Sequence, residues 1–346
     1  MTIEKRYFGE TKDGEKVDCY TLADGDMSVE ILTLGGIIRS ISLPTAQGVR
    51  DVALGFDDVA GYEAQTGFIG ALIGRVGNRI GKAVFKLGGK EYKLDKNDGD
   101  NNLHGGANGY DKLVWGAETE TDALLLTLKS PDMDGGFPGN LSIEVRYALK
   151  DRALSIEYKA ECDADTPVNL TNHCYFNLGG HSSGGIENHK LQIFSDSITP
   201  IDDTLIPTGE LLDVAGTPFD LREPKAIGEG LSSDCPQMVL GGGYDHNFVL
   251  ARELKRPLSP AAVLECDGVK MTCLTTKPGI QFYSGNFLSG ENGKQNSIYA
   301  KRSGLCLETQ FWPDSVNKPE FTDCILKKGE IYHHKTVYKF EFLHKQ

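Results

Sequence analysis

The sequence lacks any apolar run near the roughly 20 residues that a membrane-spanning helix needs, and its first segment, Met1–Gly9, lacks the apolar stretch of an export signal. It also lacks an excess of positive charge: 49 acidic residues outnumber 36 lysines and arginines, giving a formal net charge of −13. Such a surface repels polyanions, so we expect neither nucleic acid nor an acidic membrane as a partner. A neutral small molecule meets no such barrier. Because the sequence shows neither an export signal nor a membrane span, we expect a cytoplasmic location.

Metal-binding and nucleotide-binding motifs are also missing. The eight cysteines are scattered without a C-x-x-C pair, and we expect free thiols. The adjacent His333 and His334 would point to opposite faces of a strand, with no supporting ligand nearby. Neither G-x-G-x-x-G nor a Gly-Lys-Ser/Thr loop occurs. We therefore predict a protein that works without a metal or cofactor.

Short runs with a period of two residues dominate what is present. Apolar and polar residues alternate in Leu141–Leu149, and residues 154–158 and 338–342 show the same pattern. Such alternation is typical of half-buried β-strands. The segment Phe85–Leu94 has two glycines at its centre and predicts a β-hairpin.

Sustained helical periodicity is absent, and only Val59–Ala64 and Pro224–Leu231 suggest short helices. The chain has 346 residues, 41 of them glycine and 14 proline, with no internal repeat and no polar linker. Many short strands between glycine-rich turns indicate a sandwich or barrel. We predict an all-β fold, a large β-sandwich, with residues 1–346 forming a single domain.

Three segments combine an apolar face with an unusually polar one: Val168–Leu178, Ile280–Asn286 and Leu305–Trp312. In order, their polar faces carry Asn169, Thr171, His173, Tyr175 and Asn177; then Gln281 and Tyr283; then Cys306, Glu308, Gln310 and Trp312. Amides and carboxylates pair with hydroxyls, and aromatic rings cover C–H faces, so these faces suit a sugar. The alternative is three unrelated exposed strands whose polar residues serve only solubility.

The glycine-rich segment Gly70–Ile80 carries Arg75, Asn78 and Arg79. An arginine and an amide in a tight loop can hold sugar hydroxyls or a carboxylate partner. The alternative is that both arginines are structural ion-pair donors.

Two further loops place a polar group beside glycines. His104 precedes two glycines, where the backbone can approach a ligand closely, although a lone loop histidine is more often a surface residue. Asp245 follows three glycines and a tyrosine, and its carboxylate could accept hydrogen bonds from two neighbouring hydroxyls. A turn aspartate that caps its own backbone is the alternative.

Taken together, these segments resemble the galactose mutarotase (aldose 1-epimerase) family. The resemblance runs in order through GFIGALIGRVGNRI with the FKLGGKEYKL hairpin, NNLHGG, TNHCYFNLGG, GGYDHNF, IQFYSGNF and LCLETQFWPDSVNKP. It implies a large antiparallel β-sandwich, the galactose mutarotase-like supersandwich, with the sugar in an open cleft on one sheet. It also implies an isomerase that interconverts the α and β anomers of galactose- or glucose-type hexoses without a cofactor.

The resemblance implies roles for the matching positions. Glu308 would be the general base, His173 the general acid and His104 a nearby support for the ring oxygen or a hydroxyl, while Asn78, Arg79 and Asp245 would hold hydroxyls and Gln281 and Tyr175 would line the pocket. One departure is Gly77, where the family more often has alanine.

Opening a cyclic aldose requires removing a proton from the C1 hydroxyl and delivering one to the ring oxygen, which a carboxylate and an imidazolium can do. Their unperturbed pKa values, about 4.3 and about 6.5, suit this pairing, and we expect the carboxylate to raise the pKa of His173.

Three alternatives remain at this stage: a glycoside hydrolase that uses Asp245 and Glu308 as a carboxylate pair, a non-catalytic sugar-binding or sensor module, and a phosphosugar epimerase. The last should show a basic cluster beyond Arg75 and Arg79. We expect a monomer or a homodimer.

Overall fold

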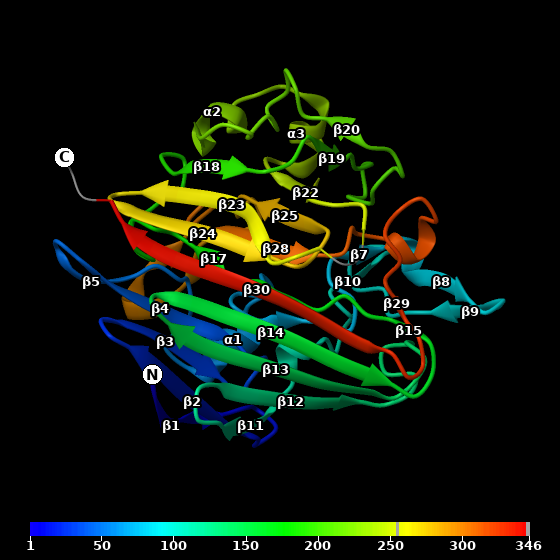
Figure 1. The fold of residues 1–346 in the computed structure, drawn as a ribbon, viewed down its shortest axis with the longest axis horizontal. Coiled ribbons are helices and arrows are strands. Elements are labelled where there is room, and N and C mark those ends of the chain that lie inside the picture. The colour runs from blue at the N-terminus through cyan, green and yellow to red at the C-terminus, as the bar shows by residue number, and fades with distance from the viewer. Residues whose placement is uncertain (254–255, 344–346) are drawn as a thin grey trace.

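The computed structural model describes residues 1–253 and 256–343, and strands dominate it (Figure 1). The all-β prediction is therefore confirmed. Three antiparallel sheets account for most of the structure. The five-stranded sheet has the order β1 (Thr2–Glu10), β2 (Lys16–Asp24), β3 (Met27–Leu32), β4 (Ile38–Thr45) and β5 (Gly48–Asp51). It lies at the lower left of Figure 1, in blue.

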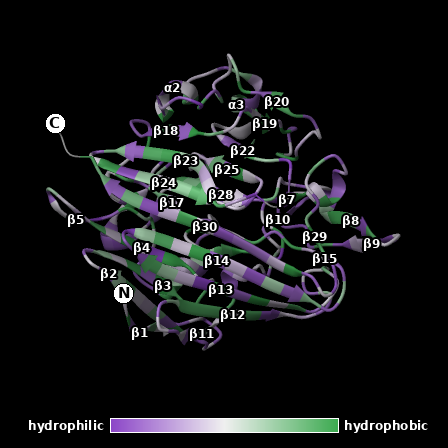
Figure 2. Ribbon diagram, in the orientation of Figure 1, coloured by the Kyte–Doolittle hydropathy of each residue, from purple (hydrophilic) through white to green (hydrophobic). Residues whose placement is uncertain are grey.

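The nine-stranded sheet crosses the front of the molecule in Figure 1. Its order is β11 (Gly116–Thr119), β12 (Leu124–Ser130), β13 (Leu141–Lys150), β14 (Ala153–Cys162), β30 (Ile331–Phe342), β24 (Val269–Thr275), β23 (Ser259–Cys266), β18 (Lys190–Ile193) and β21 (Lys225–Ala226). The period-two prediction holds here, because every odd-numbered residue from Leu141 to Leu149 is buried. Hydrophobic and hydrophilic residues alternate along these strands in Figure 2.

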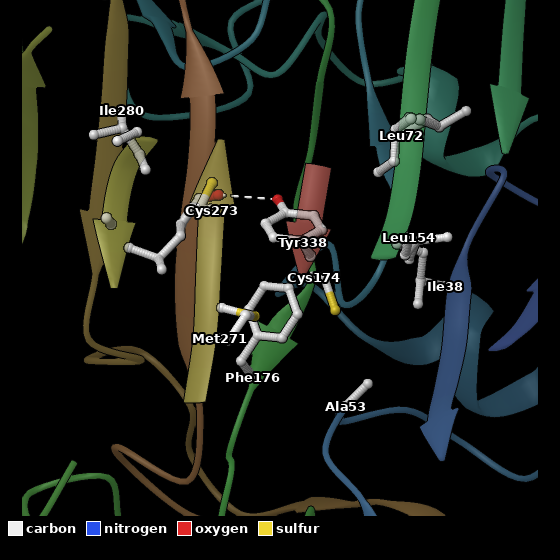
Figure 3. Packing of buried hydrophobic residues seen from close by; sticks show 14 of the residues in the cluster. Ile38, Ala53, Leu72, Leu154, Cys174, Phe176, Met271, Cys273, Ile280 and Tyr338 are labelled. Atoms are coloured by element: carbon white, nitrogen blue, oxygen red, sulfur yellow. Dashed lines mark hydrogen bonds between the residues drawn. The ribbon is translucent and has the colours of Figure 1, made fainter. Parts of the chain in front are cut away.

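The third large sheet has six strands. Its order is β17 (Tyr175–Phe176), β28 (Leu305–Gln310), β25 (Gly279–Tyr283), β22 (Asp245–Val249), β19 (Ser197–Thr199) and β20 (Leu212–Asp213). One face of it packs on the nine-stranded sheet, where Phe176 and Tyr338 lie with ring centroids 4.9 Å apart. The Tyr338 hydroxyl donates to the carbonyl of Leu307 at 3.0 Å and ties the two sheets together (Figure 3).

Small elements complete the chain. Two-stranded pairs join β6 (Leu72–Ile73) to β16 (Thr171–Asn172), β7 (Arg79–Ile80) to β10 (Asn102–Leu103), β8 (Val84–Leu87) to β9 (Lys90–Lys93), β15 (Thr166–Pro167) to β29 (Ile325–Leu326), and β26 (Glu291–Asn292) to β27 (Ile298–Tyr299). The helices are α1 (Val59–Ala64), α2 (Ile227–Leu231) and α3 (Pro236–Gly241), with single 3₁₀ turns at Gly81–Ala83, Tyr110–Lys112, Lys294–Asn296 and Ser315–Asn317.

The predicted hairpin is confirmed as β8–β9, whose two turn glycines, Gly88 and Gly89, both have positive φ, as the favoured two-residue hairpin turn requires. Both predicted short helices are also present, as α1 and as α2 within the predicted 224–231 range. The third helix, α3, was not predicted, although Pro236 at its first position is a recognisable start signal.

One predicted strand is wrong. Segment Val168–Leu178 is not a continuous strand but two separate pieces, β16 and β17. Between them the His173 amide donates to the carbonyl of Ala71, while the His173 carbonyl accepts from Gly70. The backbone thus changes partners around His173, and strict alternation does not apply across the break.

Each of the eight cysteines carries a free thiol, six of them buried. Among the helices of the described residues, none combines the length and apolarity that a bilayer crossing would take.

Arg75, a candidate sugar ligand from the sequence, is instead an internal structural residue. Its side chain is buried and turns toward a ring of acceptors on neighbouring loops. Its guanidinium donates to the carbonyls of Pro138 at 2.8 Å and Gly139 at 3.0 Å and to the Ser130 hydroxyl at 2.7 Å. Buried carbonyls require such donors, so Arg75 satisfies groups that would otherwise be unpaired.

We therefore expect Arg75→Met to lower the free energy of unfolding by about 3 kcal/mol or more, because several buried acceptors lose a charged donor at once. The matched control is Arg152→Met, whose exposed guanidinium pairs with Asp26 at the surface and should matter by less than about 1 kcal/mol. Equilibrium urea unfolding of both variants measures the difference. Equal losses in the two would contradict the internal role.

Candidate active site

A cavity of about 260 Å³ opens on the face of the six-stranded sheet that the core does not cover. Strands β17, β22, β25 and β28 contribute to it, together with loops from the first third of the chain. Its wall consists of Thr66, Gly67, Phe68, Asn78, Arg79, Asp98, Leu103, His104, His173, Tyr175, Leu205, Asp245, Tyr283, Phe287, Leu288, Glu291 and Glu308. This mixture of aromatic rings and hydrogen-bonding groups fits a small polar ligand with apolar faces.

Strand register places the polar groups side by side. Tyr283 pairs with Asp245 on one side and Cys306 on the other, and Cys306 pairs in turn with Tyr175. Two residues along the strands, Gln281 pairs with Glu308. Because alternate residues share a face, both rows point toward the cavity side of the sheet.

The opposite wall is formed where two loop segments meet through the short antiparallel pair of β7 and β10. Strand β7 pairs with β10, so Arg79 lies opposite Leu103 and the neighbouring Asn78 lies beside His104. The Asn78 amide donates to Nδ1 of His104 at 3.0 Å, and the His104 amide donates to the carbonyl of Asn78 at 3.0 Å. Both residues have positive φ, near 60° for Asn78 and 54° for His104, which turns their side chains into the site.

Ion pairs and amides fix the hydroxyl-binding candidates. Arg79 Nε donates to Asp98 Oδ2 at 2.7 Å, and Asp245 Oδ1 accepts from the Gln281 amide at 2.7 Å. Burial raises the pKa of Asp245, while the charge of Arg79 and the Gln281 hydrogen bond act against that rise. The cavity thus presents a cation, a carboxyl group and several oriented donors to a ligand.

His173 and Glu308 meet at the bottom of the cavity. His173 Nε2 lies 3.6 Å from Glu308 Oε1, and both side chains are buried. The second carboxyl oxygen of Glu308, Oε2, is buried and meets no hydrogen-bond donor among residues 1–253 and 256–343, while the residue itself lines the cavity. An imidazole and a carboxyl group this close together can both reach a bound ligand and move protons on it.

The expectation that the carboxylate raises the pKa of His173 is wrong for the ligand-free site. Burial lowers that pKa to about 4. Burial, reinforced by the nearby charge of Asp245, raises the pKa of Glu308 well above its usual range. Removal from water favours the neutral form of both groups, and a protonated Glu308 has no charge with which to stabilise an imidazolium.

His104, His173 and Glu308 also offer three ligand atoms within 4.8 Å of one another, a set that could suggest a metal ion. The hydrogen bonding of His104 argues against this use. Its Nδ1 already accepts from the Asn78 amide, so Nε2 of the neutral ring carries the hydrogen and has no free lone pair. Two ligands are then left, fewer than a protein metal site normally needs.

The structure brings together most of the residues singled out from the sequence: Asn78, Arg79, His104, His173, Tyr175, Asp245 and Glu308 all line the cavity. Gln281 does not; it lies behind Asp245 and holds its carboxyl group. Five other members of the predicted polar faces bond to protein groups instead: Asn169, Thr171, Asn177, Gln310 and Trp312. For example, Asn169 donates to the carbonyl of Phe311 and Trp312 to the carbonyl of Pro278.

Sequence reasoning missed several wall residues. Asp98 lies in a loop of polar residues with no feature that sets it apart, and only the ion pair with Arg79 brings it to the cavity. Phe68 packs edge-on against His104, with ring centroids 4.6 Å apart, yet in the sequence it is one apolar residue among glycines. Tyr283 could have been selected, because it shares the predicted polar face with Gln281.

Comparison with known proteins places the chain in a family. The aldose 1-epimerase family model matches residues 18–339. The chain is 42% identical to the galactose mutarotase of Mus musculus over 98% of this chain and 99% of that one, and 41% identical to the aldose 1-epimerase of Escherichia coli over 95% and 96%. The solved aldose epimerase homologue from C. elegans superposes with a TM-score of 0.86 at 28% identity, covering 99% of this chain and all of that one. The chain therefore belongs to the aldose 1-epimerase family.

Proposed function

We propose that Glu308 and His173 are the base and the acid with which this chain interconverts the α and β anomers of a galactose- or glucose-type hexose. Family membership makes the chain an aldose 1-epimerase, an isomerase of aldose sugars. The observation that carries the assignment is the 3.6 Å approach of His173 Nε2 to Glu308 Oε1 at the bottom of the cavity.

The reaction needs only proton transfers. The Glu308 carboxylate takes the proton of the C1 hydroxyl, the C1–ring-oxygen bond breaks as the C1 carbonyl forms, and the His173 imidazolium gives its proton to the ring oxygen. Rotation about the C1–C2 bond then presents the other face of the aldehyde. Closure reverses both transfers and returns the acid and the base to their starting forms.

The remaining wall residues hold the sugar. His104 presents a fixed Nε2–H donor beside His173, with ring centroids 5.2 Å apart, and suits the ring oxygen or a neighbouring hydroxyl. Asn78, Arg79 and Asp245 offer donors and acceptors to the other hydroxyls. Tyr175 provides an aromatic surface, and its own hydroxyl is held by the carbonyl of Gly67 at 2.8 Å.

The wall speaks against a phosphorylated substrate. Arg79 is the one lysine or arginine among the described wall residues, and Asp98 already pairs with it. Arg75, the other candidate phosphate ligand, is turned into the protein. Family membership likewise favours the epimerase over the glycoside hydrolase and the non-catalytic sugar-binding module.

We expect Glu308→Gln and His173→Asn each to lower kcat/KM for mutarotation by about 10²–10⁴-fold, because each removes one proton-transfer group while keeping a similar shape. Polarimetry with freshly dissolved α-galactose and α-glucose measures the rate and ranks the two sugars. His334→Asn, outside the cavity, is the matched control and should keep wild-type activity. Near-normal rates in either active-site variant, with thermal unfolding unchanged, would overturn the assignment.

We also expect kcat/KM to follow a bell-shaped pH profile. His173 and Glu308 together are active when they hold one proton. The number of protons is the same whether that proton sits on Glu308 or on His173. The two sides of the profile therefore report the pKa values of the pair in the free enzyme. Activity should rise through about pH 4, where His173 of the doubly protonated pair loses its proton, and fall at the raised pKa of Glu308.

The alkaline limb has a specific test. Asp245→Asn removes a negative charge that raises the pKa of Glu308, so the alkaline limb should move to lower pH while the acid limb stays in place. Initial rates between pH 3 and pH 10, corrected for uncatalysed mutarotation, provide the profiles. An acid limb near pH 6.5, or an alkaline limb that Asp245→Asn leaves in place, would contradict the assignment of the two limbs to His173 and Glu308.

A further inference from the structure

Two histidines face the same cavity, and their Nδ1 atoms have opposite kinds of partner. Nδ1 of His104 meets the backbone N–H of Asn78 at 3.0 Å. A backbone N–H can only donate, so Nδ1 must keep its lone pair and cannot take a proton without losing that bond. Burial and the charge of His173 also lower the pKa of His104 well below its usual value. His104 is therefore held as a neutral donor.

Nδ1 of His173 meets a thiol instead: Cys306 Sγ lies 3.5 Å away, within the reach of a sulfur hydrogen bond. Cys306 is fully buried and lies two residues before Glu308 on β28, so both side chains leave the strand on the same face. Strand β28 thus contacts both nitrogens of His173, through sulfur at Nδ1 and through the carboxyl group at Nε2.

We propose that Cys306 is a positioning residue for the general acid: its sulfur accepts the Nδ1–H of His173 and fixes the tautomer in which Nε2 exchanges the proton. This proposal rests on the proposed role of His173. Cys306 does not itself line the cavity, so it acts through the imidazole and not on the sugar.

The chemistry of sulfur suits this task. Burial and the nearby charge of Glu308 raise the pKa of the Cys306 thiol well above its usual value, so the sulfur stays an uncharged, weak acceptor. With its hydrogen on Nδ1, the neutral ring of His173 keeps a lone pair at Nε2, which lies 3.6 Å from Glu308 Oε1 and can take up a proton. When the proton moves to Nε2, the Nδ1–H to sulfur contact is unchanged.

A weak acceptor also keeps His173 a strong acid. A carboxylate at Nδ1 would strongly stabilise the imidazolium and raise the pKa of His173, whereas a neutral thiol orients the ring and raises that pKa only slightly. Cys306 therefore orients His173 and raises its pKa only slightly, so that burial remains the main influence on that pKa.

The test compares Cys306→Ala and Cys306→Ser with Cys174→Ala. We expect Cys306→Ala to lower kcat by about 10–100-fold with KM within about twofold of wild type, because the imidazole loses its orienting partner but the cavity wall is intact. The acid limb of the pH profile should move to lower pH, since the imidazolium loses an acceptor. Cys306→Ser keeps a donor and acceptor at this position and should recover most of the lost activity.

Cys174 is the matched control, because it is also a buried thiol and adjoins His173 in the chain, yet it packs in the apolar core near Phe176 and Tyr338 (Figure 3). Cys174→Ala should change thermal unfolding and leave kcat and the acid limb as in wild type. A loss of kcat of the same size in Cys174→Ala and Cys306→Ala, with no movement of the acid limb, would reduce Cys306 to a packing residue.

A second measurement needs no activity. The ¹⁵N chemical shifts of His173, assigned by difference from His173→Asn, report which ring nitrogen carries the hydrogen. We expect a protonated Nδ1 in the wild type and a mixture of tautomers in Cys306→Ala. An unprotonated Nδ1 in the wild type would overturn the proposal for Cys306, whereas full activity in His173→Asn would overturn the proposed function itself.

Discussion

The register of strand β28 between β25 and β17 is the constraint on which the rest of the site depends. Leu305 and Leu307 face the nine-stranded sheet, where the carbonyl of Leu307 accepts the hydrogen bond of Tyr338. Cys306 and Glu308 consequently face the cavity. A shift of one residue would exchange the two faces, placing a carboxyl group in the core and two leucines in the cavity. The same strand register therefore fixes both the packing of the sandwich and the position of Glu308.

Burial then sets the chemistry. The floor of the cavity removes both His173 and Glu308 from water, which favours their neutral forms and leaves the pair with one proton to share. The proposed ring opening needs that proton on His173 and the charge on Glu308. Asn78 and Arg79 line the same cavity as the pair, where a bound sugar and these polar groups would stabilise the charged arrangement.

Hydrogen-bond partners outside the cavity separate the roles of two chemically identical rings. His104 and His173 are both buried and both face the sugar site, yet a donor-only amide holds one and a thiol contacts the other. The same difference argues against a metal ion among His104, His173 and Glu308. Groups that touch no ligand thus decide which histidine can carry a proton, as supporting residues do in many active sites.

The sequence by itself determined the fold class, the hairpin at β8–β9 and the central polar residues of the cavity, because period-two burial and turn glycines are local properties and the family motifs are strings of residues. It did not determine the interruption between β16 and β17, since that depends on which backbone groups of the 70–73 segment reach His173. Gln281 behind Asp245, and Asp98 beside Arg79, were likewise decided by contacts between distant segments. Only the tertiary structure decided that the pKa of His173 is lowered and that of Glu308 is raised. A motif can suggest the attraction between an imidazolium and a carboxylate. The loss of water around both groups arises only when the sheets and loops close over them.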